Sequence, residues 1–179
     1  MTTAEDAALI PAWIGKSLVA LDKIEVHRRG LRHKAVSVFV TDGRDILLQR
    51  RALEKYHTAG LWANTCCTHP HWDENPLDCA VRRLREELGI EGLGPVFSGQ
   101  VEYRADVGGG MIEHEVVDVF VARADQTLVL NPDPGEVLAT RWVSLKALRA
   151  EIHDSPDRFT PWLRIYLADH FQTIFGAGL

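Results

Sequence analysis

Alternating apolar and polar positions predict strands in the first two thirds of the chain. Residues 35–41, AVSVFVT, alternate with a period of two, and an Asp-Gly turn leads from them into the apolar run 46–48. Residues 96–104 have the composition of another strand, and a tract of three glycines precedes the alternating run 112–122, IEHEVVDVFVA. We therefore predict two hairpins, separated by the middle of the chain.

A helix is expected over residues 76–88, between the two hairpins. Asn75 can cap its start, Pro76 suits its first turn, and Gly89 can end it. The apolar positions that share one face of this helix are Ala80, Leu84 and Leu88.

Two more helices are expected near the C-terminus. Ser144 can cap a short helix, and Thr160 with Pro161 can open a terminal helix. Their apolar positions are Leu145, Leu148 and Ile152 in the first and Leu163, Leu167, Phe171 and Ile174 in the second. Hairpins rather than helical crossovers join most of the strands, which disfavours a doubly wound nucleotide-binding sheet. We predict a mixed α/β fold of the α+β kind.

Length and composition favour a single domain spanning residues 1–179. A chain of 179 residues that is 46% hydrophobic can bury a core without disulfides, and no linker or internal repeat divides it. Its three cysteines have no CxxC spacing, which argues against a disulfide framework or a four-cysteine zinc site. Residues 1–20 are expected to form an N-terminal extension that becomes ordered around substrate.

Net charge and hydropathy indicate which kinds of molecule the protein binds. The net charge is −5 and no basic tail is present, so nucleic acid is not expected as a partner. No apolar run has the length of a membrane helix, and the first residues, MTTAEDAALIPAW, lack the features of a signal peptide. We expect a cytoplasmic protein that acts on a small molecule, either as a monomer or as a weak homodimer.

Two glutamates in the run 112–122 are candidates for chemistry. On a strand, Glu113 and Glu115 point to the same side as Val117 and Val119, which is the side expected to face the core. Because a buried carboxylate is costly on its own, such a pair requires a metal, another cation or a shared proton. The alternative is an edge strand whose glutamates reach water.

Histidines and a cysteine extend this candidate site. His27, His33 and His69 lie beside predicted strands or turns, and imidazole is the commonest nitrogen ligand of transition metals. Cys67 precedes His69 by two positions, so both face one side of an extended segment, where a neighbouring cation can activate the thiol. The remaining cysteines, Cys66 and Cys79, are expected to be buried and inert. The histidines assigned to the surface or to hydrogen bonds in the core are His57, His71, His153 and His170.

A cationic segment is the next candidate. Residues 49–57, QRRALEKYH, place Arg50, Arg51 and Lys55 together in an acidic chain, which suits an anionic small substrate. A solvated surface segment is the alternative.

A long spaced pattern lies over the predicted helix. Position 68, then Glu74, Arg82, Glu86, Glu87 and Gly89, resemble the Nudix box, which holds magnesium against a diphosphate. Thr68 stands where a Nudix hydrolase has glycine, and Arg83 stands where it has a magnesium-binding glutamate. These departures favour an isomerase over a pyrophosphohydrolase.

Seven segments in order resemble the type 1 isopentenyl diphosphate isomerases, a branch of the Nudix superfamily, over about residues 21–165. They are KIEVHRRGLRH, QRRALEK, GLWANTCCTHP, the altered box, YRAD, IEHEV and FTPW. The resemblance implies a Nudix-like mixed sheet packed between helices. It also implies conversion of isopentenyl diphosphate to dimethylallyl diphosphate through a tertiary carbocation, in isoprenoid biosynthesis.

The resemblance assigns site residues position by position. It implies one divalent metal, Mn²⁺, Zn²⁺ or Mg²⁺, with the ligands His27, His33, His69, Glu113 and Glu115. It makes Glu87 a ligand of a second ion, Mg²⁺, that accompanies the substrate diphosphate. The implied diphosphate contacts are Lys23, Arg51, Lys55 and Arg83.

The implied catalytic residues are Cys67 and Glu115, opposed as acid and base in an order that residue types leave open, with Tyr103 bonded to the glutamate. Trp162 is the implied aromatic wall that stabilises the cation.

Two other functions compete with the isomerase. One is a Nudix hydrolase of a nucleoside diphosphate derivative, and the other is a noncatalytic binding domain in which a metal only stabilises the fold.

Overall fold

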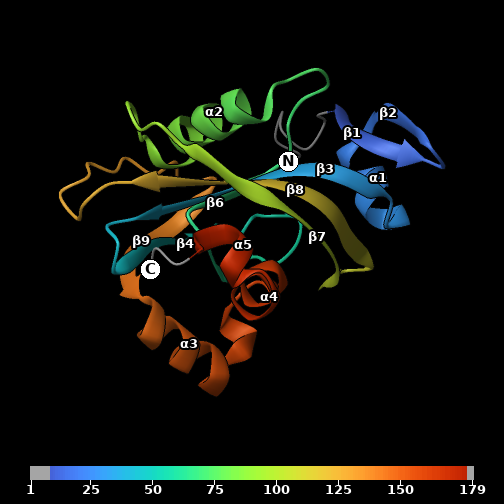
Figure 1. Ribbon diagram of the computed structural model, residues 1–179. Coiled ribbons are helices and arrows are strands. Elements are labelled where there is room, and N and C mark those ends of the chain that lie inside the picture. The colour runs from blue at the N-terminus through green and yellow to red at the C-terminus, as the bar shows by residue number, and fades with distance from the viewer. Residues whose placement is uncertain (1–8, 177–179) are drawn as a thin grey trace.

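The structure is a computed structural model that describes residues 9–176. One nine-stranded mixed sheet lies between α2 on one face and α3, α4 and α5 on the other (Figure 1). The strands are β1 (Leu9–Ile14), β2 (Ser17–Asp22), β3 (Arg32–Thr41), β4 (Asp45–Arg51), β5 (Trp62–Ala63), β6 (Cys66–Thr68), β7 (Val96–Gly108), β8 (Met111–Arg123) and β9 (Val137–Ser144). The helices are α1 (Lys23–Arg29), α2 (Pro76–Leu88), α3 (Leu145–Asp154), α4 (Pro161–Asp169) and α5 (Phe171–Phe175). The predicted fold class is confirmed.

Strand β3 is the central element of the sheet. It runs parallel to β8 from the pair Arg32 and His114 to the pair Thr41 and Arg123, and it pairs antiparallel with β6. Strand β8 also pairs antiparallel with β7 along its length. Because β8 has a strand on each side, it is not an edge strand, and the alternative in which its glutamates reach water at an edge is excluded.

The alternation of residues on β3 divides the core into two layers. Ala35 and Phe39 belong to the layer covered by α3, α4 and α5, whereas Val36, Val38 and Val40 pack against α2. Side chains on adjacent positions of a strand point to opposite faces, which explains this separation. Both faces of β3 therefore carry buried apolar side chains, as expected for a strand that is covered on both sides.

Helix boundaries follow the predicted capping residues, with one correction. The Asn75 side chain accepts a hydrogen bond from the Leu77 amide, and Gly89 ends α2 in the left-handed conformation. The Ser144 side chain caps α3 in the same way. The expected single terminal helix is wrong, because His170 leaves the helical conformation at φ −122° and divides it into α4 and α5.

The beginning of the expected N-terminal extension is ordered as a hairpin. Strands β1 and β2 pair antiparallel, and Ala12 of β1 pairs with His33 of β3. Residues 1–8 lie outside the described residues, so ordering of the extension around substrate stays a prediction. Among residues 9–176, no helix has the length and apolar character needed to cross a membrane.

Candidate active site

One cavity collects most of the residues singled out in the sequence. It is lined by Lys23, Arg51, Lys55, Cys67, His69, Arg83, Glu87, Glu113, Glu115 and Trp162. His27, His33 and Tyr103 are buried directly beside the residues of this lining. The cavity thus combines an imidazole and carboxylate cluster with a set of cationic side chains.

The two carboxylates of β8 share one phenol. Tyr103 on β7 lies opposite Glu115 in the strand register, and its hydroxyl is 2.7 Å from Oε2 of both Glu113 and Glu115. A hydroxyl has one proton to donate, so it cannot satisfy two ionised carboxylates at once. These three buried oxygen atoms therefore need a second proton or a cation among them.

The pKa values of the two glutamates move in opposite directions. Burial and the neighbouring Glu115 raise the pKa of Glu113 well above its ordinary value. Burial also acts against ionisation of Glu115, but the neighbouring His33 and His69 rings outweigh it and lower the pKa of Glu115. One carboxyl group of the pair thus keeps a proton in the metal-free protein while the other is ionised.

Two buried histidines present an unprotonated ring nitrogen to this cluster. Nδ1 of His27 lies 2.6 Å from the Lys23 carbonyl oxygen, and Nδ1 of His33 lies 2.7 Å from the Leu31 carbonyl oxygen. A carbonyl only accepts, so each Nδ1 carries the hydrogen and each Nε2 keeps its lone pair. Neither Nε2 has a hydrogen-bond partner among the described residues, although both atoms are buried.

This donor set fits a divalent metal ion. One donor atom each from His27, His33, His69 and Glu115 lie within 4.8 Å of one another. His69 Nε2 is 3.0 Å from Glu115 Oε1, and His33 Nε2 is 3.6 Å from the same oxygen. Backbone carbonyls that orient the imidazoles are the usual outer partners of metal-binding histidines. The unpartnered Nε2 atoms are explained if a cation binds among them.

Burial also keeps these rings in the form that a metal requires. It is the largest influence on His27, whose pKa falls to about 2 with further contributions from His69 and His33. The pKa of His69 falls to about 4, again chiefly through burial, although Glu115 opposes the shift. Only a neutral imidazole has a lone pair for a metal, so both rings are ready to bind at neutral pH.

His57, which the sequence assigns to the surface or to a hydrogen bond in the core, does not lie on the surface. It is 6% exposed and its Nδ1 bonds the Thr58 hydroxyl, but it also lines the cavity. Its Nε2 atom lies 3.3 Å from Glu113 Oε1, and donor atoms of His27, His57 and Glu113 form a second group within 4.8 Å. The other histidines of that assignment that lie near α2 and α3, His71 and His153, are exposed as expected.

Cys67 reaches the cavity because of its register on β6. It pairs with Ser37 of β3, whereas Cys66 pairs with Val38 and so faces the layer under α2. Burial, followed by the charges of Glu115 and Glu113, raises the pKa of the Cys67 thiol well above its ordinary value. Cys67 is therefore protonated in the metal-free protein.

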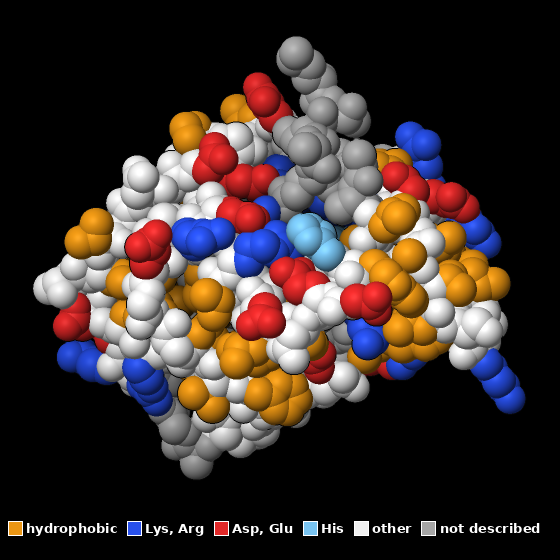
Figure 2. Space-filling model, turned by 90° about the horizontal axis from the view of Figure 1, so that it is seen from above, with side chains coloured by type: hydrophobic (Ala, Val, Ile, Leu, Met, Phe, Trp, Pro, Cys, Tyr) orange, Lys and Arg blue, Asp and Glu red, His pale blue; other side chains and the backbone are white. Residues whose placement is uncertain are grey.

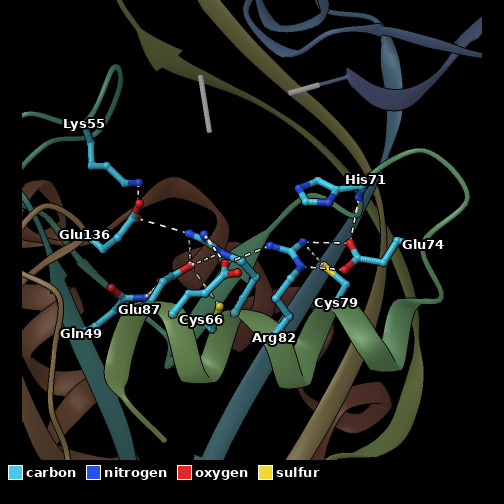
Figure 3. A network of polar contacts seen from close by, with 11 residues as sticks. Gln49, Lys55, Cys66, His71, Glu74, Cys79, Arg82, Glu87 and Glu136 are labelled. Atoms are coloured by element: carbon cyan, nitrogen blue, oxygen red, sulfur yellow. Dashed lines mark hydrogen bonds and ion pairs between the residues drawn. The ribbon is translucent and has the colours of Figure 1, made fainter. Parts of the chain in front are cut away.

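A chain of ion pairs connects α2 to the opposite wall of the cavity (Figure 3). Arg83 bonds to Glu87 and reaches Glu136, which also contacts Lys55, while Gln49 donates to Glu87. Gln49 and Glu136 line the cavity but were not selected from the sequence, since a lone glutamine and a loop glutamate follow no spacing. Arg50 of the cationic segment is instead exposed and donates to the Gly60 carbonyl.

The first half of the altered box serves α2 itself rather than the cavity. Arg82 donates to both oxygens of Glu74 and to Glu86, on the outer side of the helix (Figure 3). The molecular face above α2 accordingly carries basic and acidic side chains next to one another, with hydrophobic side chains in separate groups toward its periphery (Figure 2).

Trp162 of α4 lines the cavity, and the Arg51 guanidinium lies 5.2 Å from the centre of its ring.

Comparison with known proteins agrees with this site. A model of the NUDIX domain matches residues 31–163. An isopentenyl-diphosphate Delta-isomerase of Cereibacter sphaeroides is 66% identical over 168 residues, which cover 94% of this chain and 95% of the relative. Another, of Dinoroseobacter shibae, is 63% identical over 168 residues, covering 94% of this chain and 96% of the relative. The chain belongs to the isopentenyl-diphosphate Delta-isomerase family of Nudix proteins.

Solved structures support the Nudix fold of this family member at lower identity. The protein DR0079 of Deinococcus radiodurans superposes with a TM-score of 0.69 at 14% identity, over 89% of this chain and 96% of its own. A MutT protein of Methanosarcina mazei gives a TM-score of 0.61 at 19% identity, over 79% of this chain and 93% of its own. At this identity the two comparisons establish the fold and leave the chemistry to the site.

Proposed function

We propose that this Nudix isomerase-family chain converts isopentenyl diphosphate to dimethylallyl diphosphate, as an isopentenyl-diphosphate Delta-isomerase in isoprenoid biosynthesis. The proposal rests on isopentenyl-diphosphate Delta-isomerases that are more than 60% identical to this chain over nearly its whole length. One structural observation carries it. Cys67, Glu115 and the cationic side chains Arg51 and Lys55 all line the same cavity, so an alkene and a diphosphate can be held there together.

The reaction moves a double bond by one carbon and needs two proton transfers. A proton bonds to the terminal methylene carbon, which leaves a tertiary carbocation, and loss of a proton from the carbon nearer the diphosphate restores a double bond. An unactivated alkene is a very weak base, so the protonating group must be strong, close and shielded from water. Cys67 and Glu115 act as the opposed pair, and Tyr103 hydrogen-bonds Glu115.

An aromatic side chain protects the carbocation in this proposal. Trp162 is 1% exposed and presents its ring to the cavity, and a π face stabilises a nearby positive charge. The enclosure keeps out water that would otherwise capture the cation. Trp162 thus has a role in binding and in protecting the intermediate.

The cationic side chains of the cavity bind the diphosphate in this proposal. Lys23, Arg51, Lys55 and Arg83 supply positive charge, and Glu87, which accepts from Arg83, would bind a Mg²⁺ ion that enters with the substrate. Magnesium prefers a few protein carboxylates together with phosphate oxygens. The other divalent ion, Mn²⁺, Zn²⁺ or Mg²⁺, would be held by His27, His33, His69, Glu113 and Glu115. It would supply positive charge that favours ionised carboxyl groups on β8.

A single NMR experiment tests the function. Purified protein is incubated with Mg²⁺ and isopentenyl diphosphate in deuterated water, while proton spectra follow the allylic signals and phosphorus spectra follow phosphate release. Dimethylallyl diphosphate containing deuterium is the expected product. Phosphate release without isomerisation would instead support a hydrolase, and an inert mixture with metal bound would support a binding domain.

Matched cysteine variants locate the reaction in this cavity. Cys67→Ala is expected to lose turnover by at least about a hundredfold, because general acid–base groups contribute that much or more. Cys79→Ala is the control, since Cys79 is a buried residue of α2 and does not line the cavity. Equal turnover of the two variants would remove Cys67 from the mechanism.

We further propose that the protein is a cytoplasmic monomer or weak homodimer with no nucleic acid or membrane partner.

A further inference from the structure

His57 enters the active-site cavity from the loop that follows β4. Its side chain is 3% exposed, and Nε2 lies 3.3 Å from Glu113 Oε1. This contact is not aligned as a hydrogen bond, and Nε2 has no hydrogen-bond partner among residues 9–176. A buried polar nitrogen without a partner requires an explanation in the chemistry of its surroundings.

The hydrogen bonds of Thr58 fix which nitrogen of His57 carries the hydrogen. The Thr58 hydroxyl donates its only proton to the His57 carbonyl oxygen at 2.8 Å. It therefore accepts from His57 Nδ1, which lies 3.0 Å away. The neutral ring then has a lone pair on Nε2 that faces Glu113 Oε1, and an ionised Glu113 would likewise offer only lone pairs there. A cation or a proton is needed between them.

The backbone holds His57 in this position. Thr58 has φ +48°, a left-handed conformation that is unfavourable for a β-branched residue. Arg51 Nη2 donates to the His57 carbonyl oxygen at 3.2 Å, which ties the loop to the end of β4. Strained conformations of this kind persist where the surrounding structure fixes them, and they cluster at functional sites.

We propose that His57 is an additional ligand of the divalent metal ion, so that four imidazoles and two carboxylates bind it. This inference rests on the metal centre of the proposed function. The donor group of His27, His57 and Glu113 shares His27 with the donor group that contains His33, His69 and Glu115. The two groups join into one set of six nitrogen and oxygen donors, enough to fill an octahedral shell.

The ring contacts around His27 support a single centre. The His27 ring centroid lies 4.8 Å from that of His33, 5.0 Å from that of His69 and 5.5 Å from that of His57. His27 thus has the other three imidazoles around it and belongs to both groups of donor atoms. A shared proton between His57 and Glu113 is the competing explanation, and it leaves His57 outside the metal shell.

The experiment uses Mn²⁺ alone as the probe, with the wild-type protein, His57→Ala and His57→Gln. The control is His153→Ala, which removes an exposed histidine of α3. Titration of Mn²⁺ followed by electron paramagnetic resonance gives the affinity, and X-ray absorption of the loaded proteins counts the bound imidazoles. We expect four imidazoles in the wild type and in His153→Ala, three in both His57 variants, and an affinity loss of about tenfold or more in the His57 variants.

The inference is overturned if the wild type and both His57 variants bind Mn²⁺ with equal affinity and the same imidazole count. His57→Gln keeps a side chain of similar size at this position, and circular dichroism of the metal-free proteins checks that the variants fold. The proposed function is tested separately by deuterium incorporation with the wild type. Isomerisation with only three imidazoles bound would reject the role of His57 and retain the function, whereas a wild type that binds no Mn²⁺ would reject both the ligand role and the metal centre.

Discussion

Arg83 and Glu87 lie one turn apart on α2 and form a buried ion pair, with Nη2 2.8 Å from Oε1. In the hydrolase form of the box, position 83 would carry a second acidic residue next to Glu87 on the same helical face. The arginine of this chain neutralises that face and leaves Glu87 as its buried acid. The altered box therefore replaces a pair of acidic groups with one acid and one cation.

The first prediction concerns the stability of this pair. Both side chains are 5% exposed, so removing one partner leaves a buried charge without its counterion. Arg83→Met is expected to lower the free energy of unfolding by about 3 kcal/mol. The double variant Arg83→Met with Glu87→Met should recover at least half of that loss, because no uncompensated charge remains. Urea unfolding of the metal-free proteins measures both values, and a double variant as unstable as the single one would contradict this account.

The second prediction concerns the cationic segment 49–57. It compares the two cationic residues of this segment that line the cavity with one that lies on the surface. Arg51→Ala and Lys55→Ala should each raise KM for isopentenyl diphosphate by about tenfold, because a charge-assisted contact to phosphate contributes roughly 1.5 kcal/mol or more. Arg50→Ala is the matched control, since Arg50 is exposed and bonds to the Gly60 carbonyl. Steady-state kinetics with saturating Mg²⁺ decide the matter. The same KM for all three variants would show that Arg51 and Lys55 do not bind the diphosphate.

The third prediction concerns the two glutamates of β8. Their Oε2 atoms share the Tyr103 hydroxyl, and Oε1 of Glu115 lies beside His69. Glu113→Gln and Glu115→Gln should both weaken Mn²⁺ binding by about tenfold or more, since each loses an anionic oxygen donor. Cys67→Ser should leave the affinity unchanged. Metal analysis after dialysis measures the occupancy, and full occupancy in both glutamine variants would remove these carboxylates from the centre.

How much of this site follows from sequence depends on whether its residues lie on regular elements. Glu113, Glu115, Cys67 and His69 could be grouped because alternation on a strand fixes the side to which each points. The cap of α2 at Asn75 was equally predictable from local chemistry. His33 joins them by residue type and by its place beside a predicted strand, and the resemblance of motifs adds Tyr103 on β7 and Trp162 on α4.

Residues whose position depends on tertiary structure could not be found in this way. His57 enters the cavity because Thr58 adopts a left-handed backbone, and Glu136 approaches Arg83 from a loop more than fifty residues away along the chain. Neither residue belongs to a periodic pattern. The break at His170 was missed for a similar reason, because the apolar period continues across it while Ile174 still packs into the core.

The fourth prediction is a loss of stability of the metal-free protein in mild acid. Burial, with the charges of His69 and His33, lowers the pKa of His27 from 6.5 to about 2, so the folded state keeps this ring neutral. The unfolded state binds a proton below pH 6.5 and the folded state does not, so stability is complete above that pH and decreases below it. Each such histidine contributes about 1.4 kcal/mol per pH unit. Urea unfolding with a chelator at pH 8, 6 and 5 measures the slope.

A matched pair of variants identifies the histidine responsible. His27→Gln should reduce the slope below pH 6.5, whereas His153→Gln should leave it unchanged because His153 is exposed. Saturating Mn²⁺ should raise the stability but leave this slope in place, since the unfolded state still binds the proton and the folded state still does not. A slope that is the same in both variants would show that His27 titrates alike in the folded and unfolded states.

The fifth prediction lies at lower pH and on the outer side of α2. Burial opposes ionisation of Glu74, but two hydrogen bonds from Arg82 and one from the His71 amide outweigh it and lower the pKa of Glu74 from 4.5 to about 2. The stability from this carboxylate is therefore complete above about pH 4.5 and is lost as the pH falls toward 2. Glu74→Gln should unfold with a shallower dependence on pH in that range. Glu25→Gln is the control, because the pair of Glu25 with Arg29 is half exposed and contributes little. If wild type and Glu74→Gln lose stability in parallel between pH 4.5 and 2, Arg82 does not hold Glu74 in its ionised form, and the altered box has no electrostatic role at the start of α2.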